Sequence, residues 1–233
     1  MADMATRTAT DQELALLRLL QLVSPSLPVG GFTYSQGIEW AVECGWTQSA
    51  SDLEAWLEDQ LHSTIARLDL PVLMRLYMAV QRDDLANLQQ WSSFLLACRE
   101  TSELRLEERN RGRALADLLV KLELPGSESW KSILAQSQLA GFAFAACRWA
   151  IPLEQGALGY AWSWLENLVL AAVKLIPLGQ TQGQQVLQRL TPMLPALLPV
   201  SVELQDEDIG AANPALAIAS SLHETQYTRL FRS

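Results

Sequence analysis

The chain has 233 residues, of which 49% are hydrophobic and 18% are charged, and its formal net charge at pH 7 is -9. This acidic balance argues against nucleic-acid binding, because contacts to phosphates require a basic patch. The sequence has neither an uncharged run of the roughly 18 residues that span a membrane nor the layout of a signal peptide, so we expect a cytoplasmic protein. The high hydrophobic fraction favours extensive protein–protein interfaces.

The amino-terminal region is predicted to be a short flexible tail followed by a helix. The tail covers residues 1–10, and residues 11–233 are predicted to form one domain. Thr10 and Glu13 have the spacing of a capping box, which places the start of the first helix at this point. This helix must end before Pro25, because the residue before a proline disfavours helical backbone angles.

The first glycine-rich loop is the most unusual local sequence. Gly30 and Gly31 are adjacent and are followed by Tyr34. Glycines beside aromatic residues indicate a loop that packs closely against another part of the structure, and a short helix is expected from Ser35 to Glu43. A phosphate-binding loop would need the G-x-x-x-x-G-K-[ST] pattern after a strand, and neither is present. A purely structural loop between helices stays an open alternative.

Two helices are predicted in the next region, one on each side of Pro71. Ser51 and Glu54 form a second capping box before an amphipathic pattern. Pro71 suits the first turn of a separate helix, and Asp83 or Asp84 suits the cap of the helix that follows.

The second half of the chain is divided by prolines and glycines. The remaining predicted helices cover about residues 100–122, 127–149, 152–175 and 182–190, with a last helix opened by Asn213. We find no strand alternation and no internal repeat. The sequence therefore predicts an all-α fold, a single compact multi-helix domain of about nine to ten helices.

The charged segment between residues 97 and 113 has two readings. Arg99 with Glu103, and Glu107 with Arg111, are four residues apart, the spacing at which opposite charges meet along a helix. Exposed pairs of this kind contribute little, so a solvated helix face is one interpretation. A charged ridge that faces a partner is the other.

Lys174 is the single charge in the apolar run of residues 168–177. Burying an unpaired ammonium costs several kcal/mol, so Lys174 should have a carboxylate, a carbonyl or a route to solvent. A position near a helix carboxyl end, where carbonyls attract cations, is the simplest role.

Metal ligands and catalytic motifs are scarce. The three cysteines are far apart, and the two histidines, His62 and His223, are not at ligand spacing. His223 and Glu224 do not extend to H-E-x-x-H, because Tyr227 stands where the second histidine would be. We therefore expect no metal site, no cofactor and no catalytic residue.

Five stretches resemble the UreF family of urease accessory proteins. They are PVGGFTYSQGIEWAVE, ACRETSELRLEERNRG, QSQLAGFAF, AAVKLIPLGQ and HETQYTRLFRS, in this order between about Leu16 and Ser233. The resemblance implies an all-α homodimer that binds UreD (also called UreH) and through it recruits the GTPase UreG. It implies a non-catalytic adaptor, or chaperone, for GTP-dependent nickel insertion into apo-urease. An all-helical enzyme with an unrecognised site and an unrelated helical scaffold are the alternatives.

The resemblance also indicates residues that would face partners. Lys174 matches the family's lysine in its AxVKLxP segment, and Arg229 matches the arginine in its YxRLF segment. With the glycine loop and the carboxy-terminal tail, the predicted partner-binding residues are Gly30, Gly31, Tyr34, Glu39, Lys174, Tyr227, Arg229 and Phe231. The tail is expected to be mobile in the isolated chain, with docking on the chain's own core as the alternative.

Overall fold

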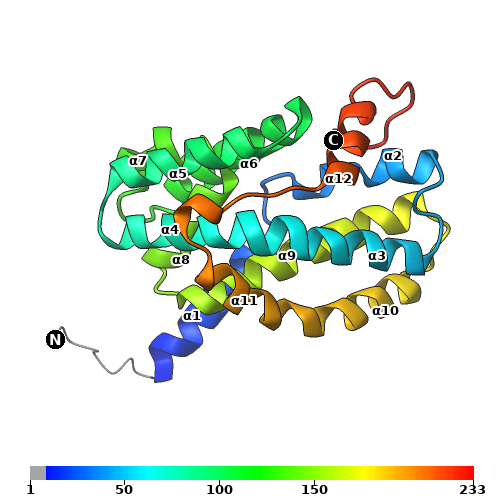
Figure 1. Cartoon of the computed structure of the whole chain (residues 1–233). Coiled ribbons are helices and arrows are strands. Elements are labelled where there is room, and N and C mark those ends of the chain that lie inside the picture. The colour runs from blue at the N-terminus through cyan, green and yellow to red at the C-terminus, as the bar shows by residue number, and fades with distance from the viewer. Residues whose placement is uncertain (1–8) are drawn as a thin grey trace.

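One long helical run crosses the middle of the molecule. The computed structural model describes residues 9–233, and within it α3 (Ala50–Gln60), a π-helical segment (Leu61–Asp69) and α4 (Leu70–Gln81) follow one another without a break. Figure 1 shows this run as the cyan helix between the upper and lower layers. Pro71 lies in the first turn of α4, as predicted, but α4 continues the preceding helical run instead of starting as a separate helix.

Pro71 is accommodated because other parts of the chain bind the carbonyls that it leaves free. A proline in a helix removes one N–H donor and crowds the preceding turn. The hydroxyl of Ser201 donates to the carbonyl oxygen of Ala66 at 2.8 Å, and the amide of Gly210 donates to that of Arg67 at 3.0 Å. Both donors come from the last third of the sequence. The widened π-helical turns thus end where the proline stands.

The remaining helices surround this run. They are α1 (Ala9–Leu22), α2 (Ile38–Glu43), α5 (Leu85–Cys98), α6 (Ser102–Lys121), α7 (Ser127–Leu134), α8 (Gln138–Arg148), α9 (Leu153–Leu175), α10 (Gln180–Leu190), α11 (Leu194–Glu203) and α12 (Pro214–His223). Short 3₁₀ turns cover Gly31–Thr33, Thr191–Met193 and Asp206–Asp208. The described part of the chain contains no strand, and it forms one compact domain. The all-α prediction is confirmed.

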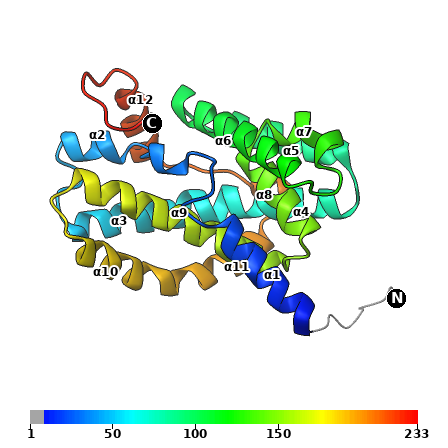
Figure 2. The ribbon, with the colours of Figure 1, turned by 180° about the vertical axis from the view of Figure 1, so that it is seen from behind.

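The helices are arranged in groups around α4 and α9. At one end, α5, α6, α7 and α8 pack against one another and against α4, while α10 and α11 lie along the opposite side (Figure 1). Seen from behind, α9 runs through the middle of the molecule with α1 across one of its ends (Figure 2). At the other end α12 packs on α2 and α6, so the last residues of the chain lie beside an early helix.

The predicted helix caps have mixed outcomes. Within the described residues α1 covers Ala9–Leu22, so Thr10 lies inside the helix. The capping box of α3 is formed by Ser49 and Asp52, two residues before the predicted pair. The predicted cap at Asp84 is confirmed, since its side chain accepts the amide of Asn87.

Two predicted helices have different bounds. α2 begins at Ile38 instead of Ser35, because Gly37 adopts a left-handed conformation with φ of 80°. The predicted helix of residues 127–149 is two helices, α7 and α8. Ser137 separates them, since its side chain accepts the amides of Leu139 and Ala140 and so starts a new helix.

The most apolar helices form the centre of the domain. Residues 138–146 of α8 are all buried, and α9 contributes a further series of buried side chains. Their apolar character is therefore explained by packing within one chain and carries no argument for a subunit interface. Along the described residues, no helix combines the length and apolar character needed to cross a membrane.

Candidate partner-binding site

The carboxy-terminal tail (residues 224–233) is docked on the chain's own helices. The amide of Arg232 donates to the carbonyl of Thr33 at 2.8 Å, and the hydroxyl of Ser35 donates to the main-chain oxygen of Ser233 at 2.7 Å. The tail therefore runs beside the glycine loop (residues 23–37, between α1 and α2). The expectation of a mobile tail is not met in the structure. The docked alternative holds instead, although the tail has no helical turn.

Glu39 fixes the tail from the first turn of α2. Its carboxylate accepts the amides of Leu230 at 2.5 Å and Phe231 at 2.9 Å. The side chain is almost completely buried, where an ionised carboxylate needs such donors. Its place at a helix amino terminus, where backbone N–H groups favour a negative charge, also stabilises it.

His223, the last residue of α12, is fully buried between two glutamates. Its Nε2 lies 3.1 Å from Glu39, and its Nδ1 lies 2.7 Å from Glu103 in the first turn of α6. Each ring nitrogen thus faces a carboxylate oxygen. A hydrogen bond forms at each contact when either the ring nitrogen or the facing carboxyl oxygen carries a hydrogen. Arg229 of the tail completes the cluster with an ion pair to Glu103 at 2.8 Å. We call Glu39, Glu103, His223 and Arg229 the tail cluster.

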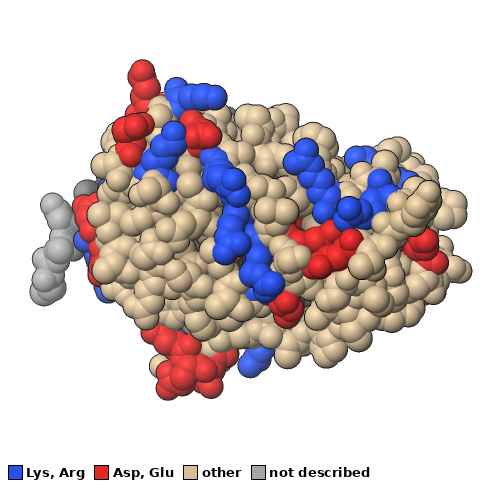
Figure 3. Space-filling model, turned by 90° about the horizontal axis from the view of Figure 1, so that it is seen from above, with Lys and Arg blue, Asp and Glu red and all other residues tan. Residues whose placement is uncertain are grey.

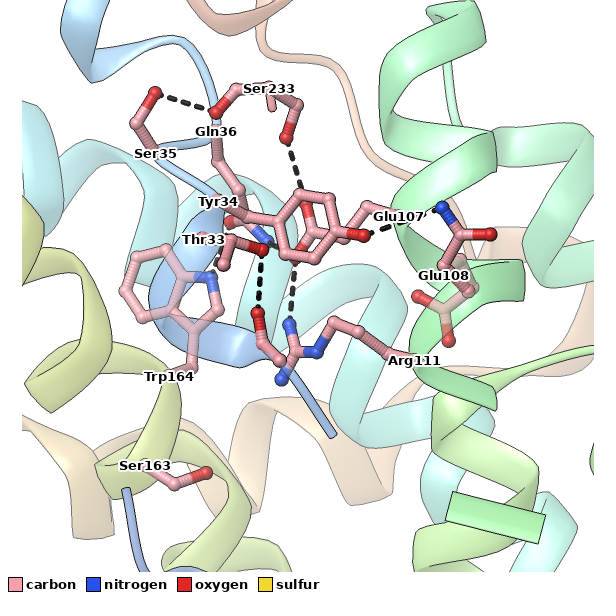
Figure 4. A network of polar contacts seen from close by, with 12 residues as sticks. Thr33, Tyr34, Ser35, Gln36, Glu107, Glu108, Arg111, Ser163, Trp164 and Ser233 are labelled. Carbon is pink, nitrogen blue, oxygen red and sulfur yellow. Dashed lines mark hydrogen bonds and ion pairs between the residues drawn. The ribbon is translucent and has the colours of Figure 1, made fainter. Parts of the chain in front are cut away.

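A second network of polar contacts lies under the end of the tail (Figure 4). Glu107 of α6 accepts hydrogen bonds from Gln36 at 2.9 Å, from Arg111 at 2.7 Å and from the hydroxyl of Ser233 at 3.3 Å. Gln36 also accepts the indole N–H of Trp164 on α9 at 2.9 Å. The glycine loop, α6, α9 and the tail are therefore joined at one buried carboxylate.

The predicted loop residues lie at this network. Gly30 has φ of 74°, a conformation that favours glycine, and it precedes the 3₁₀ turn. Gly31 has no positive φ, and a Cβ there would meet only the side chains of Asn167 and Arg111 at 3.4–3.5 Å. Gly30, and not Gly31, is therefore the position where the backbone conformation favours glycine. Tyr34 is buried, and its hydroxyl contacts Asn110 of α6 at 3.4 Å.

Of the other predicted residues, Lys174 and Phe231 lie together at the end of the tail, and Tyr227 does not join them. The ammonium of Lys174 lies over the ring of Phe231, 5.5 Å from its centre, which is a cation–π contact. Lys174 is exposed, so it has the route to solvent that its apolar surroundings demand. Phe231 is only 6% exposed and anchors the tail, whereas Tyr227 is fully exposed and lies apart from the tail cluster.

A third set of buried charges joins the helices behind the site. Arg99 contacts Asp69 at 2.9 Å and Glu108 at 3.0 Å, and the hydroxyl of Tyr160 donates to Asp69 at 2.8 Å. The predicted pair of Arg99 with Glu103 does not form, because Arg99 caps α5 with extended backbone and lies outside α6. The predicted pair of Glu107 with Arg111 is confirmed, but it is buried instead of solvated.

The surroundings shift the pKa values of this third set. Burial acts to lower the pKa of Arg99, but the charges of Asp69 and Glu108 outweigh it and hold that pKa well above the ordinary value. Burial acts to raise the pKa of Glu108, but Arg99 and the amide of Leu139 outweigh it, so that pKa is lowered. The pKa of Tyr160 is raised well above its ordinary range by burial and by the negative charge of Asp69. Arg99 and Glu108 therefore stay charged, and Tyr160 stays neutral, over a wider pH range than the same groups in solvent.

The charged groups of the site leave little free space between them. A closed cavity of about 20 Å³ lies among these charged groups, room for about one water molecule and too small for a substrate. Within residues 9–233, no group of three His, Cys, Asp or Glu side chains is placed to hold a metal ion. The polar groups instead bind one another and the tail.

Sequence reasoning missed three central residues of the site: His223, Glu103 and Glu107. At the level of sequence, His223 is weighed only as a metal ligand, and the two glutamates are placed in helix pairs on either a solvated face or a partner-facing ridge. Glu103 and Glu107 are one helical turn apart, so two acids on one helix face were a usable signal. Their partners His223 and Gln36 lie more than 70 residues away in the sequence, which local spacing does not reveal.

Fold and site together define an all-α protein that presents a docked chain segment over buried ion pairs. The UreF family model matches residues 47–191. The chain is 56% identical over 223 residues to the urease accessory protein UreF of Pseudomonas putida (strain GB-1), which covers 96% of this chain and 100% of that relative. It is 58% identical over 221 residues to the UreF of Pseudomonas entomophila (strain L48), covering 95% of this chain and 99% of that relative.

A more distant relative gives the same result. The urease accessory protein UreF of Klebsiella pneumoniae (strain MGH 78578) is 49% identical over 217 residues, covering 93% of this chain and 97% of its own. The chain belongs to the UreF family of urease accessory proteins.

Proposed function

We propose that this chain is a non-catalytic adaptor, a chaperone in urease activation. In this proposal it forms a homodimer, binds UreD (UreH) and recruits the GTPase UreG, and the assembly inserts nickel into apo-urease in a GTP-dependent reaction in the cytoplasm. The observation that carries the proposal is the tail, which the tail cluster holds at the surface of a chain that belongs to the UreF family. The partner names come from the resemblance of the five sequence stretches to that family.

The tail has the composition of a binding element. Tyr227, Leu230 and Arg229 are exposed, while Phe231 anchors the segment beneath Lys174. Aromatic and arginine side chains on a fixed backbone contribute strongly to protein interfaces, because little conformational entropy is lost on binding. We therefore propose that the tail, Lys174 and the glycine loop form one partner-binding surface.

Arg229→Ala tests this function. The variant, the unchanged chain and Arg82→Ala, which removes an exposed arginine at the end of α4, are co-purified with UreD, UreG and apo-urease. Urease activity is then measured after addition of nickel and GTP. We expect Arg229→Ala to weaken UreG recruitment and urease activation, and Arg82→Ala to leave both unchanged. The circular-dichroism spectrum should be the same for all three proteins. Normal activation by the variant would remove the tail from the proposed surface, and failure of the unchanged chain to assemble would contradict the adaptor function itself.

A further inference from the structure

Three arginines form a row on the outer side of α6. Arg105, Arg109 and Arg113 follow one another at intervals of four residues, so they lie on one helix face about 6 Å apart along its axis. Figure 3 shows a band of basic side chains crossing the face of the molecule over this helix. We call these three residues the arginine row.

Two members of the row, Arg109 and Arg113, have no ion-pair or side-chain hydrogen-bond partner among the described residues. Among residues 9–233, neither Arg109 nor Arg113 makes an ion pair or a side-chain hydrogen bond, and Arg105 donates only to the carbonyl of Arg99. Other arginines of this acidic chain are paired with carboxylates: Arg75, Arg99, Arg111, Arg148, Arg189 and Arg229. The row is therefore a local concentration of positive charge on a chain of net charge -9.

A groove of about 540 Å³ lies beside the row. The arginines form one wall, and the groove is also lined by apolar side chains, Leu96 and Ala97 of α5 and Ala135 after α7. None of the tail cluster residues lines it. The groove thus combines an apolar floor with a basic wall and is separate from the surface proposed for the tail.

We propose that this groove binds an acidic amphipathic helix of a protein partner. A helix with carboxylates at every fourth position would match the spacing of the arginines, because its own side chains repeat at the same interval. Its apolar face would cover Leu96, Ala97 and Ala135, as in other helix-in-groove complexes. Arginine forms bidentate contacts with carboxylates, which gives such pairs directional specificity.

Nucleic acid is a weaker match for the same charges. The first and last arginines of the row are eight residues apart along the helix, about 12 Å, which limits the row to a few phosphates. The net negative charge of the chain would also repel a long polyanion. The inference deepens the proposed adaptor function, on which it rests, by assigning a second contact surface and the chemistry of its partner.

The test uses charge reversal with a matched control. Arg109→Glu/Arg113→Glu removes the two unpaired cations and leaves Arg105 in its contact with the Arg99 carbonyl. Arg67→Glu/Arg82→Glu makes the same change in net charge at two exposed arginines elsewhere. The first probe is a synthetic helix with glutamate at every fourth position and leucines on one side, and binding is measured by fluorescence anisotropy at low and high salt. Circular dichroism checks that each variant is folded.

We expect the acidic helix to bind the unchanged chain and the control, and to bind the Arg109/Arg113 variant at least about tenfold more weakly, with salt reducing the difference. Equal binding to all three proteins, or no binding to any, would overturn the proposal. Tighter binding of a duplex RNA probe than of the peptide, lost in the same variant, would assign the groove to nucleic acid and overturn it as well.

A second arm separates this inference from the adaptor function. The same proteins are co-purified with UreD, UreG and apo-urease, each added alone and then together. If the Arg109/Arg113 variant fails to bind one partner that the unchanged chain and the control still bind, the groove proposal is supported. If the unchanged chain, the Arg109/Arg113 variant and the control assemble equally with the partners, the adaptor function stands and the groove proposal fails. If the unchanged chain binds none of them, the adaptor function fails, and the peptide result decides the groove alone.

Discussion

At the scale of single residues, the site depends on carboxylates whose partners are far apart in the sequence. Glu39 binds His223 and two tail amides, and Glu103 binds His223 and Arg229. His223 contacts both glutamates, so it links α2, α6 and α12 at a single buried point. Burying these charges is favourable only while every oxygen keeps a donor.

We predict that His223→Gln destabilises the fold and loosens the tail. Glutamine has one amide group to donate where the imidazole contacts two carboxylates, so one glutamate would lose a donor in a buried place. The free energy of unfolding should fall by about 1–3 kcal/mol, the usual cost of an unsatisfied buried polar group. Urea unfolding measures this change, and hydrogen exchange at the amides of Leu230 and Phe231 should become faster.

His62 supplies the control for this prediction, because it is the chain's other histidine and is exposed. His62→Gln should change the free energy of unfolding by less than about 0.5 kcal/mol. Equal stability of the two variants would contradict the role assigned to His223.

Tyr160 gives a prediction about alkaline pH. Its pKa is raised by burial and then by Asp69 and Glu108, so the folded chain retains a proton that the unfolded chain releases above about pH 10. The protonated phenol therefore contributes its full stabilisation below pH 10, and this contribution is lost as the pH rises toward the folded-state pKa. Tyr160→Phe should cost about 1 kcal/mol at pH 7, through the lost hydrogen bond to Asp69, and should flatten the decrease in stability above pH 10. Urea unfolding between pH 7 and 11 measures both effects.

The exposed Tyr227 is the matched control for the alkaline experiment. Tyr227→Phe removes an exposed hydroxyl, so it should change the free energy of unfolding at pH 7 by less than about 0.5 kcal/mol. A Tyr160→Phe curve parallel to that of the unchanged chain would show that this phenol does not titrate differently in the two states.

At the scale of elements, α6 has two charged sides with different roles. Glu103, Glu107 and Glu108 face inward and are bonded to other helices, while the arginine row faces outward. For residues 97–113 the sequence is consistent with either a solvated helix face or a ridge that faces a partner. The structure shows that some of these charges are neither, since Arg99, Arg111 and the three glutamates make buried contacts that join the helices.

Gly112 determines how closely α6 approaches α8, and its replacement by alanine is our third prediction. A Cβ at this position would lie 2.7 Å from the carbonyl carbon of Ser137 and 2.9 Å from its nitrogen, both backbone atoms. Alanine improves helix propensity by up to about 1 kcal/mol, but overpacking against rigid backbone costs about 1–3 kcal/mol. Gly112→Ala should therefore lower the thermal unfolding midpoint.

Gly156 on α9 offers a control with the opposite sign. A Cβ there would make only ordinary contacts, 3.7 Å from Ala146 and 3.9 Å from Ile151. Gly156→Ala should thus keep or raise the unfolding midpoint, since only the propensity gain applies. A higher midpoint for Gly112→Ala as well would mean that α6 can move away from α8 at little cost.

Local signals predicted the helical class and most helix ends, but they did not predict how the elements continue or meet. The caps at Asp84 and Asn213 could be predicted because a cap involves residues three positions apart. The continuous run through Pro71 could not, since Ser201 and Gly210 provide the donors from more than 130 residues away. The resemblance of the tail to a known family indicated where the site lies, whereas its long-range partners in the tail cluster required the structure.

At the scale of the whole molecule, the hydrophobic fraction is only partly explained by the core. α8 and α9 are buried within the chain, yet α1 has its own exposed leucines: Leu14, Leu16, Leu17 and Leu20. A groove of about 630 Å³, lined mainly by apolar side chains of α1, α9 and the start of α11, lies beside them. Exposed apolar surface of this kind commonly marks an interface, so we place the proposed homodimer contact at α1.

Leu16→Glu/Leu20→Glu tests this assignment, because both leucines are exposed and line the groove. Two carboxylates would have to lose their hydration in an apolar contact, so the dimer dissociation constant should rise at least about tenfold while the helix content stays unchanged. Sedimentation velocity over a dilution series measures it. Val200→Glu/Val202→Glu adds the same charges to exposed apolar positions of α11 and should leave the dimer intact. A dimer of unchanged strength in the α1 variant would place the contact elsewhere, and an unchanged chain that stays monomeric at high concentration would exclude the homodimer.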